Sequence, residues 1–338
     1  MVRGSADAGE RAAAEWVAGR LREEGVEDVA LEPYRWPRTH VWAQIPHLLA
    51  SLGPLWLRAL ALASYELDQS GRLQWVQRFV PRGHGANVVA RVPAQGPARR
   101  MLVLVAHLDA QRTGLIWHRR LTESGERRRL KTRAMTPAAL LSAPVLLARS
   151  RTLKLLGLAL LLDTATSPTV PGANDNASGV AAVLEVVRRV AAEPLESTEL
   201  LALFPGAEEA GVGGMRAFLK AHDLDPSTTF VLGLDTVGSG TPIVAEAEGA
   251  LLAHRYREED LAFVERAAGT DPPQRWRIAA YTDPILARFR GLPSASILSV
   301  GGHGFYTRYH RMDDVPEHVD LVCVARAATI AERVARAL

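Results

Sequence analysis

Short runs of apolar residues alternate with longer amphipathic stretches along this chain. Three runs are continuous and apolar enough for buried parallel strands: Met101 to Ala106, Leu200 to Phe204 and Phe230 to Leu234. Apolar residues recur at helical spacing over residues 9–25, ahead of a strand at 26–34, and further helices are expected over 177–192, 213–222 and 319–338. This alternation predicts an α/β fold, a three-layer doubly wound mixed sheet with helices on both faces.

Two long apolar stretches stand apart from this alternation. They cover residues 43–64 and 138–162, and each is long enough for a membrane span of roughly 20 residues. Pro54 and Arg58 interrupt the first stretch. Pro144 and three cationic residues interrupt the second, where each central charge would cost about 2.5–3.5 kcal/mol on insertion.

We therefore expect a single catalytic domain over residues 1–338. Its insertions, at about 40–80 and 110–170, should form a helical subdomain that packs beside the site or makes peripheral contact with a membrane surface.

Composition narrows the function classes. The 338 residues are 48% hydrophobic, which is ample for one large core. The net charge is +3, but the basic residues are scattered among acids without aromatic interleaving, so nucleic acid is not an expected partner. Cys323 is the single cysteine, and alone it can form neither a disulfide nor a thiolate cluster. No basic-then-apolar signal segment opens the chain, so we expect a cytoplasmic or peripherally membrane-associated protein.

Acidic residues and histidines recur where apolar runs end. They are His107 and Asp109, Asp175, Glu208 and Glu209, Asp235, and His310. Because parallel strands present their carboxyl ends at one edge of an α/β sheet, these side chains are expected to meet there. Nitrogen and oxygen donors in this number suit a pair of Zn²⁺ ions, with one carboxylate as a bridge. Two such ions, roughly 3.5–4 Å apart, would activate a shared water for hydrolysis.

Each of these motifs has a commoner explanation when taken alone. A His-x-Asp at a strand end is usually a polar pair, and a Glu-Glu pair is typical of a solvated helix start. The Asn-Asp-Asn at 174–176 is typical of a turn. These explanations are nearly independent of one another, so the coincidence of all the motifs favours a metal site.

The same segments resemble a known family. The chain contains VLVAHLDA, PGANDNASG, FPGAEEAGVGG, LGLDTVG and YHRMDDVPEHVD in this order. These motifs resemble the co-catalytic zinc aminopeptidases of metallopeptidase family twenty-eight, whose relatives include carboxypeptidase-like and glutaminyl-cyclase-like enzymes. The resemblance covers most of the chain and implies a zinc-exopeptidase-like fold.

The resemblance implies a ligand set for two Zn²⁺ ions. His107, Asp175 and Asp235 would bind one ion, and Asp175, Glu209 and His310 would bind the other. Asp175 would then bridge the pair.

Three further residues would support the reaction. Asp109 would accept the second ring N–H of His107 and so fix its tautomer. Glu208 sits beside a ligand and would serve as general base and acid. Tyr281 would donate a hydrogen bond to the developing oxyanion.

The predicted function is hydrolysis of peptide bonds by a zinc-dependent exopeptidase, with an aminopeptidase acting on a peptide or aminoacyl substrate as the leading candidate. A hydroxide formed at the metal pair would attack the scissile carbonyl. Arg308 leaves a carboxypeptidase or dipeptidase open, and the same chemistry suits an acyl-amino-acid amidase. From a different class, the alternatives are a catalytically silent, membrane-associated binding module and a single-zinc cyclase. The complete ligand set disfavours both.

Overall fold

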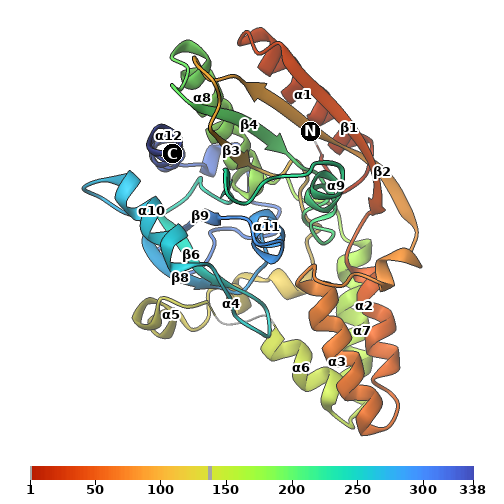
Figure 1. Cartoon of the computed structure of the whole chain (residues 1–338). Coiled ribbons are helices and arrows are strands. Elements are labelled where there is room, and N and C mark those ends of the chain that lie inside the picture. The colour runs from red at the N-terminus through yellow and green to blue at the C-terminus, as the bar shows by residue number, and fades with distance from the viewer. Residues whose placement is uncertain (1, 136–138) are drawn as a thin grey trace.

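One mixed sheet of nine strands runs through the centre of the molecule (Figure 1). The computed structural model describes residues 2–135 and 139–338, and the side chains of residues 139–142 lie outside the description. The strand order is β1-β2-β4-β3-β5-β9-β6-β7, with β8 paired to β6. The strands are β1 (Asp28–Pro37), β2 (Arg82–Val92), β3 (Arg100–Val105), β4 (Thr198–Phe204), β5 (Thr229–Leu234), β6 (Thr241–Glu248), β7 (His254–Arg255), β8 (Gln274–Ile278) and β9 (Ser294–Val300).

The centre of the sheet is parallel and buried. Strands β4, β3, β5 and β9 run parallel to one another, whereas β2 pairs antiparallel with β4 and β6 pairs antiparallel with β9. The three continuous apolar runs of the sequence form β3, β4 and β5, as predicted. A strand covered by helices on both faces has no side that favours polar residues, which explains why these runs do not alternate.

Helices cover both faces of the sheet. On one face lie α1 (Ala8–Glu23), α8 (Ser178–Ala192), α10 (Glu258–Ala268) and α12 (Leu321–Ala337), and on the other lie α9 (Gly213–Ala221) and α11 (Asp283–Phe289). Asp7 and Asp320 begin α1 and α12, since their carboxylates accept hydrogen bonds from first-turn N–H groups. The predicted three-layer, doubly wound mixed sheet is confirmed.

The two long apolar stretches form four helices that project from the sheet (Figure 1). The first stretch gives α2 (Val41–Ala50) and α3 (Leu55–Gln69), and the second gives α6 (Ala139–Leu147) and α7 (Arg151–Thr166). Residue 138, where the second stretch begins, lies outside the described residues. We call these four helices the arm. Within the described part of the chain, no helix is both long enough and apolar enough to cross a membrane.

The carboxyl ends of the central strands meet at one edge, near the root of the arm. Val105 of β3 pairs with Leu203 of β4 and with Gly233 of β5. The segments that follow these positions therefore emerge side by side. Short helical segments complete the chain: η1 (Val76–Arg78), η2 (Leu115–Trp117), α4 (Arg119–Thr122), α5 (Glu126–Thr132), η3 (Ala173–Ala177) and η4 (Pro316–His318).

Candidate metal centre

Five of the predicted side chains come together at the carboxyl edge of the sheet. Donor atoms of His107, Asp175 and Asp235 lie within 4.8 Å of one another, and so do donor atoms of Asp175, Glu209 and His310. His107 Nε2 lies 3.3 Å from Asp175 Oδ1, while His310 Nε2 lies 3.2 Å from Asp175 Oδ2. The two oxygens of Asp175 thus face the two groups, as a bridging carboxylate must.

Asp109 fixes the turn that carries both glutamates. Its Oδ1 accepts the backbone N–H of Glu208 at 3.0 Å, and its Oδ2 accepts the N–H of Glu209 at 3.2 Å and the hydroxyl of Ser5 at 2.6 Å. His107 Nδ1 hydrogen-bonds the backbone oxygen of Asp109 at 3.2 Å and lies 3.5 Å from Oδ1. Asp109 is therefore beside His107 as expected, but its main-chain oxygen makes the closer contact. Its carboxylate chiefly positions the neighbouring acids.

Asp175 lies in a turn that buried polar residues hold. Asp314 accepts the backbone N–H groups of Asn174 and Asp175 at 2.8 and 3.1 Å. The amide of Asn176 donates to the backbone oxygen of Leu234 at 3.0 Å, which ties the turn to the end of β5. The peptide bond between Asp175 and Asn176 is cis.

Aromatic rings and an unusual backbone hold His310. The ring of Tyr309 stacks on its imidazole at a centroid distance of 3.6 Å, and the ring of Trp117 packs edge-on at 4.3 Å. His310 has a φ of 54°, and Ala207 and Thr236, each next to a predicted site residue, have φ of 49° and 52°. Left-handed φ at non-glycine residues costs about 1–3 kcal/mol each, so the surrounding structure must stabilise these three positions. Such strain is typical of functional sites.

The site carries an excess of negative charge. Carboxylates of Asp175, Glu208, Glu209 and Asp235 surround the two histidines, and each is buried or nearly so. Burial alone would lower the pKa of His310, but the nearby carboxylates raise it to about 9. The negative charge of these carboxylates therefore favours binding of a cation at this site.

Several donor atoms lack conventional partners. Glu209 Oε1 and both ring nitrogens of His310 are buried without a hydrogen-bond partner among the described residues. His310 Nε2 lies 3.2 Å from an oxygen of Asp175 and from one of Glu209, yet makes no hydrogen bond to either. Because buried polar atoms are normally satisfied, this arrangement fits ligands that share a cation. Imidazole nitrogen and carboxylate oxygen are typical zinc donors, so the residues fit zinc.

Glu208 lies beside the two donor groups and belongs to neither. Its Oε2 is 4.0 Å from His107 Nε2, and its side chain is 10% exposed. Burial raises the pKa of Glu208 well above its usual value, and the carboxylates of Glu209 and Asp235 raise it further against the opposing effect of His107. The carboxylate is therefore next to the donor groups and still reachable from outside.

A cavity of about 370 Å³ opens beside Glu208, Glu209 and His310. Both the sheet edge and the arm form its walls. The arm contributes apolar side chains from three of its helices: Leu48, Val145, Leu146, Leu160 and Leu161. The described residues that line the cavity include no lysine or arginine. Gln44, Tyr65 and Gln69 of the arm also line the cavity. The cavity is therefore mostly apolar on the side of the arm and acidic on the side of the donor groups.

Four tyrosines line this cavity, and the hydroxyls of two of them, Tyr281 and Tyr306, differ in their hydrogen bonding. The hydroxyl of Tyr281 donates to Glu66 Oε1 of α3 at 2.6 Å, so the predicted oxyanion donor is already bonded to the arm. Tyr306 is buried, and its hydroxyl has no hydrogen-bond partner among the described residues. Tyr306 therefore lines the cavity and carries an unpartnered hydroxyl among the described residues, although the sequence patterns did not single it out.

Other supporting residues also escaped the sequence analysis. Arg3 donates to the backbone oxygens of Leu108 and Gly172, at 2.8 Å each, and so clamps the end of β3 to the Asp175 turn. Gln111 donates to Glu209 Oε2 at 3.0 Å. The position of Gln111, shortly after the His-x-Asp motif, was a signal that could have indicated it. Arg3 is 105 residues from Leu108, and nothing local marks it.

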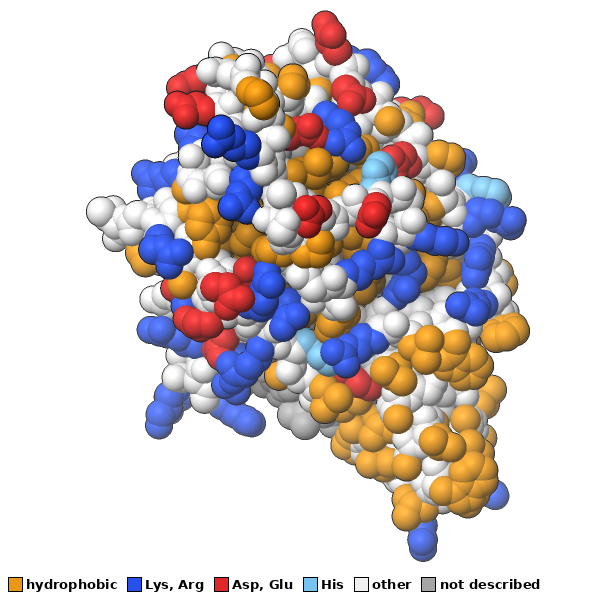
Figure 2. Space-filling view, viewed as in Figure 1, with side chains coloured by type: hydrophobic (Ala, Val, Ile, Leu, Met, Phe, Trp, Pro, Cys, Tyr) orange, Lys and Arg blue, Asp and Glu red, His pale blue; other side chains and the backbone are white. Residues whose placement is uncertain are grey.

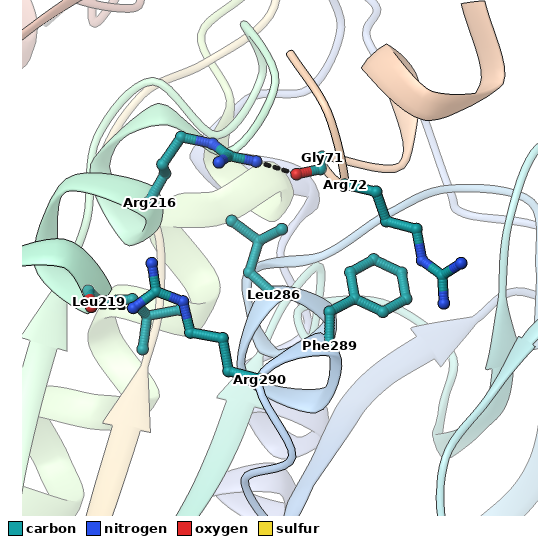
Figure 3. Close-up of a pocket in the computed structure, with 7 residues that line it drawn as sticks. All are labelled: Gly71, Arg72, Arg216, Leu219, Leu286, Phe289 and Arg290. Carbon is teal, nitrogen blue, oxygen red and sulfur yellow. Dashed lines mark hydrogen bonds between the residues drawn. The ribbon is translucent and has the colours of Figure 1, made fainter. Parts of the chain in front are cut away.

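A second cavity, of about 300 Å³, lies where the end of α3 meets α9 and α11 (Figure 3). It is lined by Gly71, Arg72, Arg216, Leu219, Leu286, Phe289 and Arg290. Arg216 donates to the backbone oxygen of Gly71, and the guanidinium of Arg72 lies 4.5 Å from the centre of the Phe289 ring. These contacts join the root of the arm to α9 and α11 on one face of the sheet, at a place separate from the donor groups.

Comparison with known proteins defines the class of this protein. Residues 87–335 match Peptidase family M28. Since this match covers most of the chain, the chain belongs to Peptidase family M28, a family of zinc-dependent metallo-exopeptidases. The resemblance inferred from the sequence motifs is confirmed.

Individual relatives match either a short part of the chain or the whole chain at low sequence identity. A segment of 77 residues is 39% identical to the probable lipoprotein aminopeptidase LpqL of Mycobacterium tuberculosis (strain ATCC 25618 / H37Rv), covering 22% of this chain and 15% of that protein. The chain thus spans a small part of that relative. The structure of an aminopeptidase from Aneurinibacillus sp. strain AM-1 is 14% identical, with a TM-score of 0.62 over 99% of this chain and 89% of that one. The glutaminyl cyclase of Bacteroides thetaiotaomicron bound to N-acetylhistamine is 15% identical, with a TM-score of 0.59 over 99% and 92%. At these identities the structural likeness shows the fold alone.

Proposed function

We propose that the chain is an aminopeptidase that holds two zinc ions and releases apolar N-terminal residues from peptides. One observation carries the proposal. The cavity beside Glu208, Glu209 and His310 has acidic and apolar walls, and its described lining includes no lysine or arginine. A site that anchors a substrate carboxylate normally uses such a cation, whereas a free amino group needs none.

The two donor groups define how zinc would be held. His107, Asp175 and Asp235 would bind one ion, and Asp175, Glu209 and His310 would bind the other. When bound, the ions supply a water of lowered pKa and stabilise negative charge on the substrate carbonyl. Asp109 and Asp314 accept hydrogen bonds from backbone N–H groups on either side of the site. These bonds hold the backbone segments that carry the donor atoms in place.

Glu208 would move the proton. Its carboxylate lies beside the donor groups and lines the cavity, so it reaches both the metal site and the substrate. From this position it accepts a proton from the attacking water and delivers it to the departing amine. The hydrogen bond from the Glu208 N–H to Asp109 fixes the backbone from which it acts.

The apolar wall suggests which residue the enzyme removes. Leu48, Leu146 and Leu161 of the arm line the cavity opposite the acids. A large apolar side chain of the substrate would bury its surface against them, while a charged side chain would lose hydration without a partner. Leucine and phenylalanine at the N-terminus are therefore the expected preferences.

The carboxypeptidase alternative depended on Arg308 as the anchor for a substrate carboxylate. Arg308 Nε lies 3.7 Å from Asp313 Oδ2 and has no hydrogen-bond partner among the described residues. Arg308 is also not among the described residues that line the cavity.

Tyr306→Phe is expected to lower kcat roughly 100-fold while zinc content stays at the wild-type level. The Tyr306 hydroxyl is buried in the cavity wall without a partner among the described residues, so it can donate to the developing oxyanion. Tyr281→Phe should cost less, because the Tyr281 hydroxyl is bonded to Glu66. Steady-state hydrolysis of leucine anilide by both variants, with elemental analysis, measures the difference. A larger loss in Tyr281→Phe would return the oxyanion role to Tyr281.

A substrate panel tests the proposed function itself. Wild-type protein is expected to hydrolyse leucine and phenylalanine anilides in a chelator-sensitive reaction, with much slower release from aspartate and lysine anilides. N-acetylated leucine anilide should not react, because its amino group is blocked.

Other outcomes of the same panel would overturn the proposal. Turnover confined to an N-blocked dipeptide with a free carboxylate would identify a carboxypeptidase, and hydrolysis of acetyl-leucine would identify an amidase. Cyclisation of an N-terminal glutamine would identify a cyclase. Zinc-loaded protein that turns over none of these substrates would support a binding module.

A further inference from the structure

Polar contacts of one lysine join three of the four helices of the arm, α2, α6 and α7. Lys154 of α7 is buried, and its ammonium donates to Ser51 Oγ at 2.8 Å and to the backbone oxygens of Val145 and Leu146 at 3.3 and 3.2 Å. Helix α3 has 15 residues, so it is about 22 Å long. The two outer turns of the arm, at 51–54 and 148–150, therefore lie about 22 Å from its root.

The outer end of the arm exposes large apolar side chains. We define the arm tip as residues 49–58 and 147–153. Leu52, Leu55 and Trp56 are 53%, 63% and 64% exposed, and Leu60 and Leu155 continue the apolar surface along the arm. Figure 2 shows that hydrophobic side chains dominate this part of the molecule, with cationic side chains at its end. A contiguous apolar surface of this kind marks an interaction site.

The apolar side chains that face inward already have a role. Leu48, Leu146 and Leu161 line the cavity beside the metal centre. Leu52, Leu55 and Trp56 at the tip are exposed and line neither cavity. Packing within the described chain therefore does not account for Leu55 and Trp56.

The charge of the tip is entirely positive. Residues 41–65 and 127–162 contain no aspartate or glutamate. Arg149 and Arg151 are exposed in and beside the outer turn of the second stretch, and Arg58 lies half-buried near the first, where it donates to the oxygen of Gly53. Leucine and tryptophan combined with arginine and no acid is typical of surfaces that lie in the headgroup region of anionic membranes.

We propose that the arm tip inserts into the surface of a lipid bilayer that contains anionic lipids. Leu52, Leu55 and Trp56 would enter the boundary between headgroups and acyl chains, and Arg149 and Arg151 would contact lipid phosphates. A symmetric contact between the tips of two copies would instead bring together two cationic surfaces that contain no aspartate or glutamate. This inference goes beyond the proposed peptidase activity and does not depend on it.

Vesicle flotation of the full chain tests the inference. We expect the wild type to bind phosphatidylcholine vesicles that contain about one third phosphatidylglycerol, to bind pure phosphatidylcholine much more weakly, and to lose binding at high salt. Leu55→Ser/Trp56→Ser should weaken binding at least tenfold. The matched control is Trp16→Ser/Leu321→Ser, which removes two side chains that are 55% and 73% exposed elsewhere, and it should bind like the wild type.

Charge reversal separates the contribution of the arginines to membrane binding from that of the apolar side chains. Arg149→Glu/Arg151→Glu should abolish the preference for anionic vesicles while its thermal unfolding matches the wild type. Wild-type protein that ignores both kinds of vesicle, or tip and control variants that bind equally, would overturn the inference. A concentration-dependent dimer that Leu55→Ser/Trp56→Ser dissolves, in place of vesicle binding, would assign the tip to a second copy. Anilide hydrolysis bears on none of these outcomes, so the proposed function and the membrane contact fail separately.

Discussion

Glu208→Gln is expected to reduce kcat by roughly 10²–10⁴-fold while both zinc ions stay bound. Glutamine keeps the size of the side chain but cannot accept and release a proton. Glu208 belongs to neither donor group, and its backbone contact with Asp109 does not involve the side chain that changes. Turnover of leucine anilide and zinc per chain, measured on the same preparation, test both parts of the expectation.

The control for this variant is another glutamate in the same chain. Glu196 is exposed in the segment before β4, so Glu196→Gln should retain wild-type turnover and zinc content. Undiminished turnover in Glu208→Gln would remove Glu208 from proton transfer. Loss of zinc together with turnover would instead make Glu208 a ligand.

The residues of the two donor groups could be predicted from the sequence to lie together because strand ends are local features. His107 and Asp235 follow apolar runs that can be recognised without any knowledge of the fold. A parallel sheet then brings such ends to one edge, because its register aligns them. The structure accordingly places His107 and Asp235 with Asp175 in one donor group.

The residues that hold these donor groups in place could not be found in this way. Arg3 and Asp314 act through backbone groups of segments 105 and 139 residues away, and no local pattern records such contacts. Tyr306 and Tyr281 differ in whether the hydroxyl has a hydrogen-bond partner. Glu66 of the arm accepts a hydrogen bond from Tyr281, and the hydroxyl of Tyr306 has no partner among the described residues.

Hydropathy alone could not predict the structure of the arm. The two apolar stretches were evident in the sequence, but their length also fitted a membrane span. Lys154, which in the sequence is a charge that opposes a span, is buried between helices and satisfied by Ser51 and two backbone oxygens. Pro54 precedes the first residue of α3, so it starts a helix and does not interrupt one. Which apolar side chains face the cavity and which remain exposed follows from packing alone.

Asp175→Asn is expected to lose more zinc than any other single ligand substitution. Asp175 contributes an oxygen to each donor group, whereas His310 and Asp235 each serve one. An amide nitrogen cannot replace the second carboxylate oxygen, so both sites lose a ligand at once. Elemental analysis should find well under one zinc per chain, with no measurable turnover. His310→Ala should retain about one ion, since the group around His107 keeps all of its donors.

Thermal unfolding gives Asp175→Asn a second readout that does not require activity. An ion that binds only the folded chain stabilises it by roughly 3 kcal/mol at a hundred times its dissociation constant, so the variant should melt roughly 5 °C or more below the zinc-loaded wild type. Chelator should lower the Tm of the wild type and leave that of Asp175→Asn unchanged. Asp223→Asn, at an exposed position beyond α9, should behave like the wild type in both measurements. Two zinc ions per chain in Asp175→Asn would contradict the bridging role, because an asparagine side chain has one oxygen to offer and the two donor groups need one each.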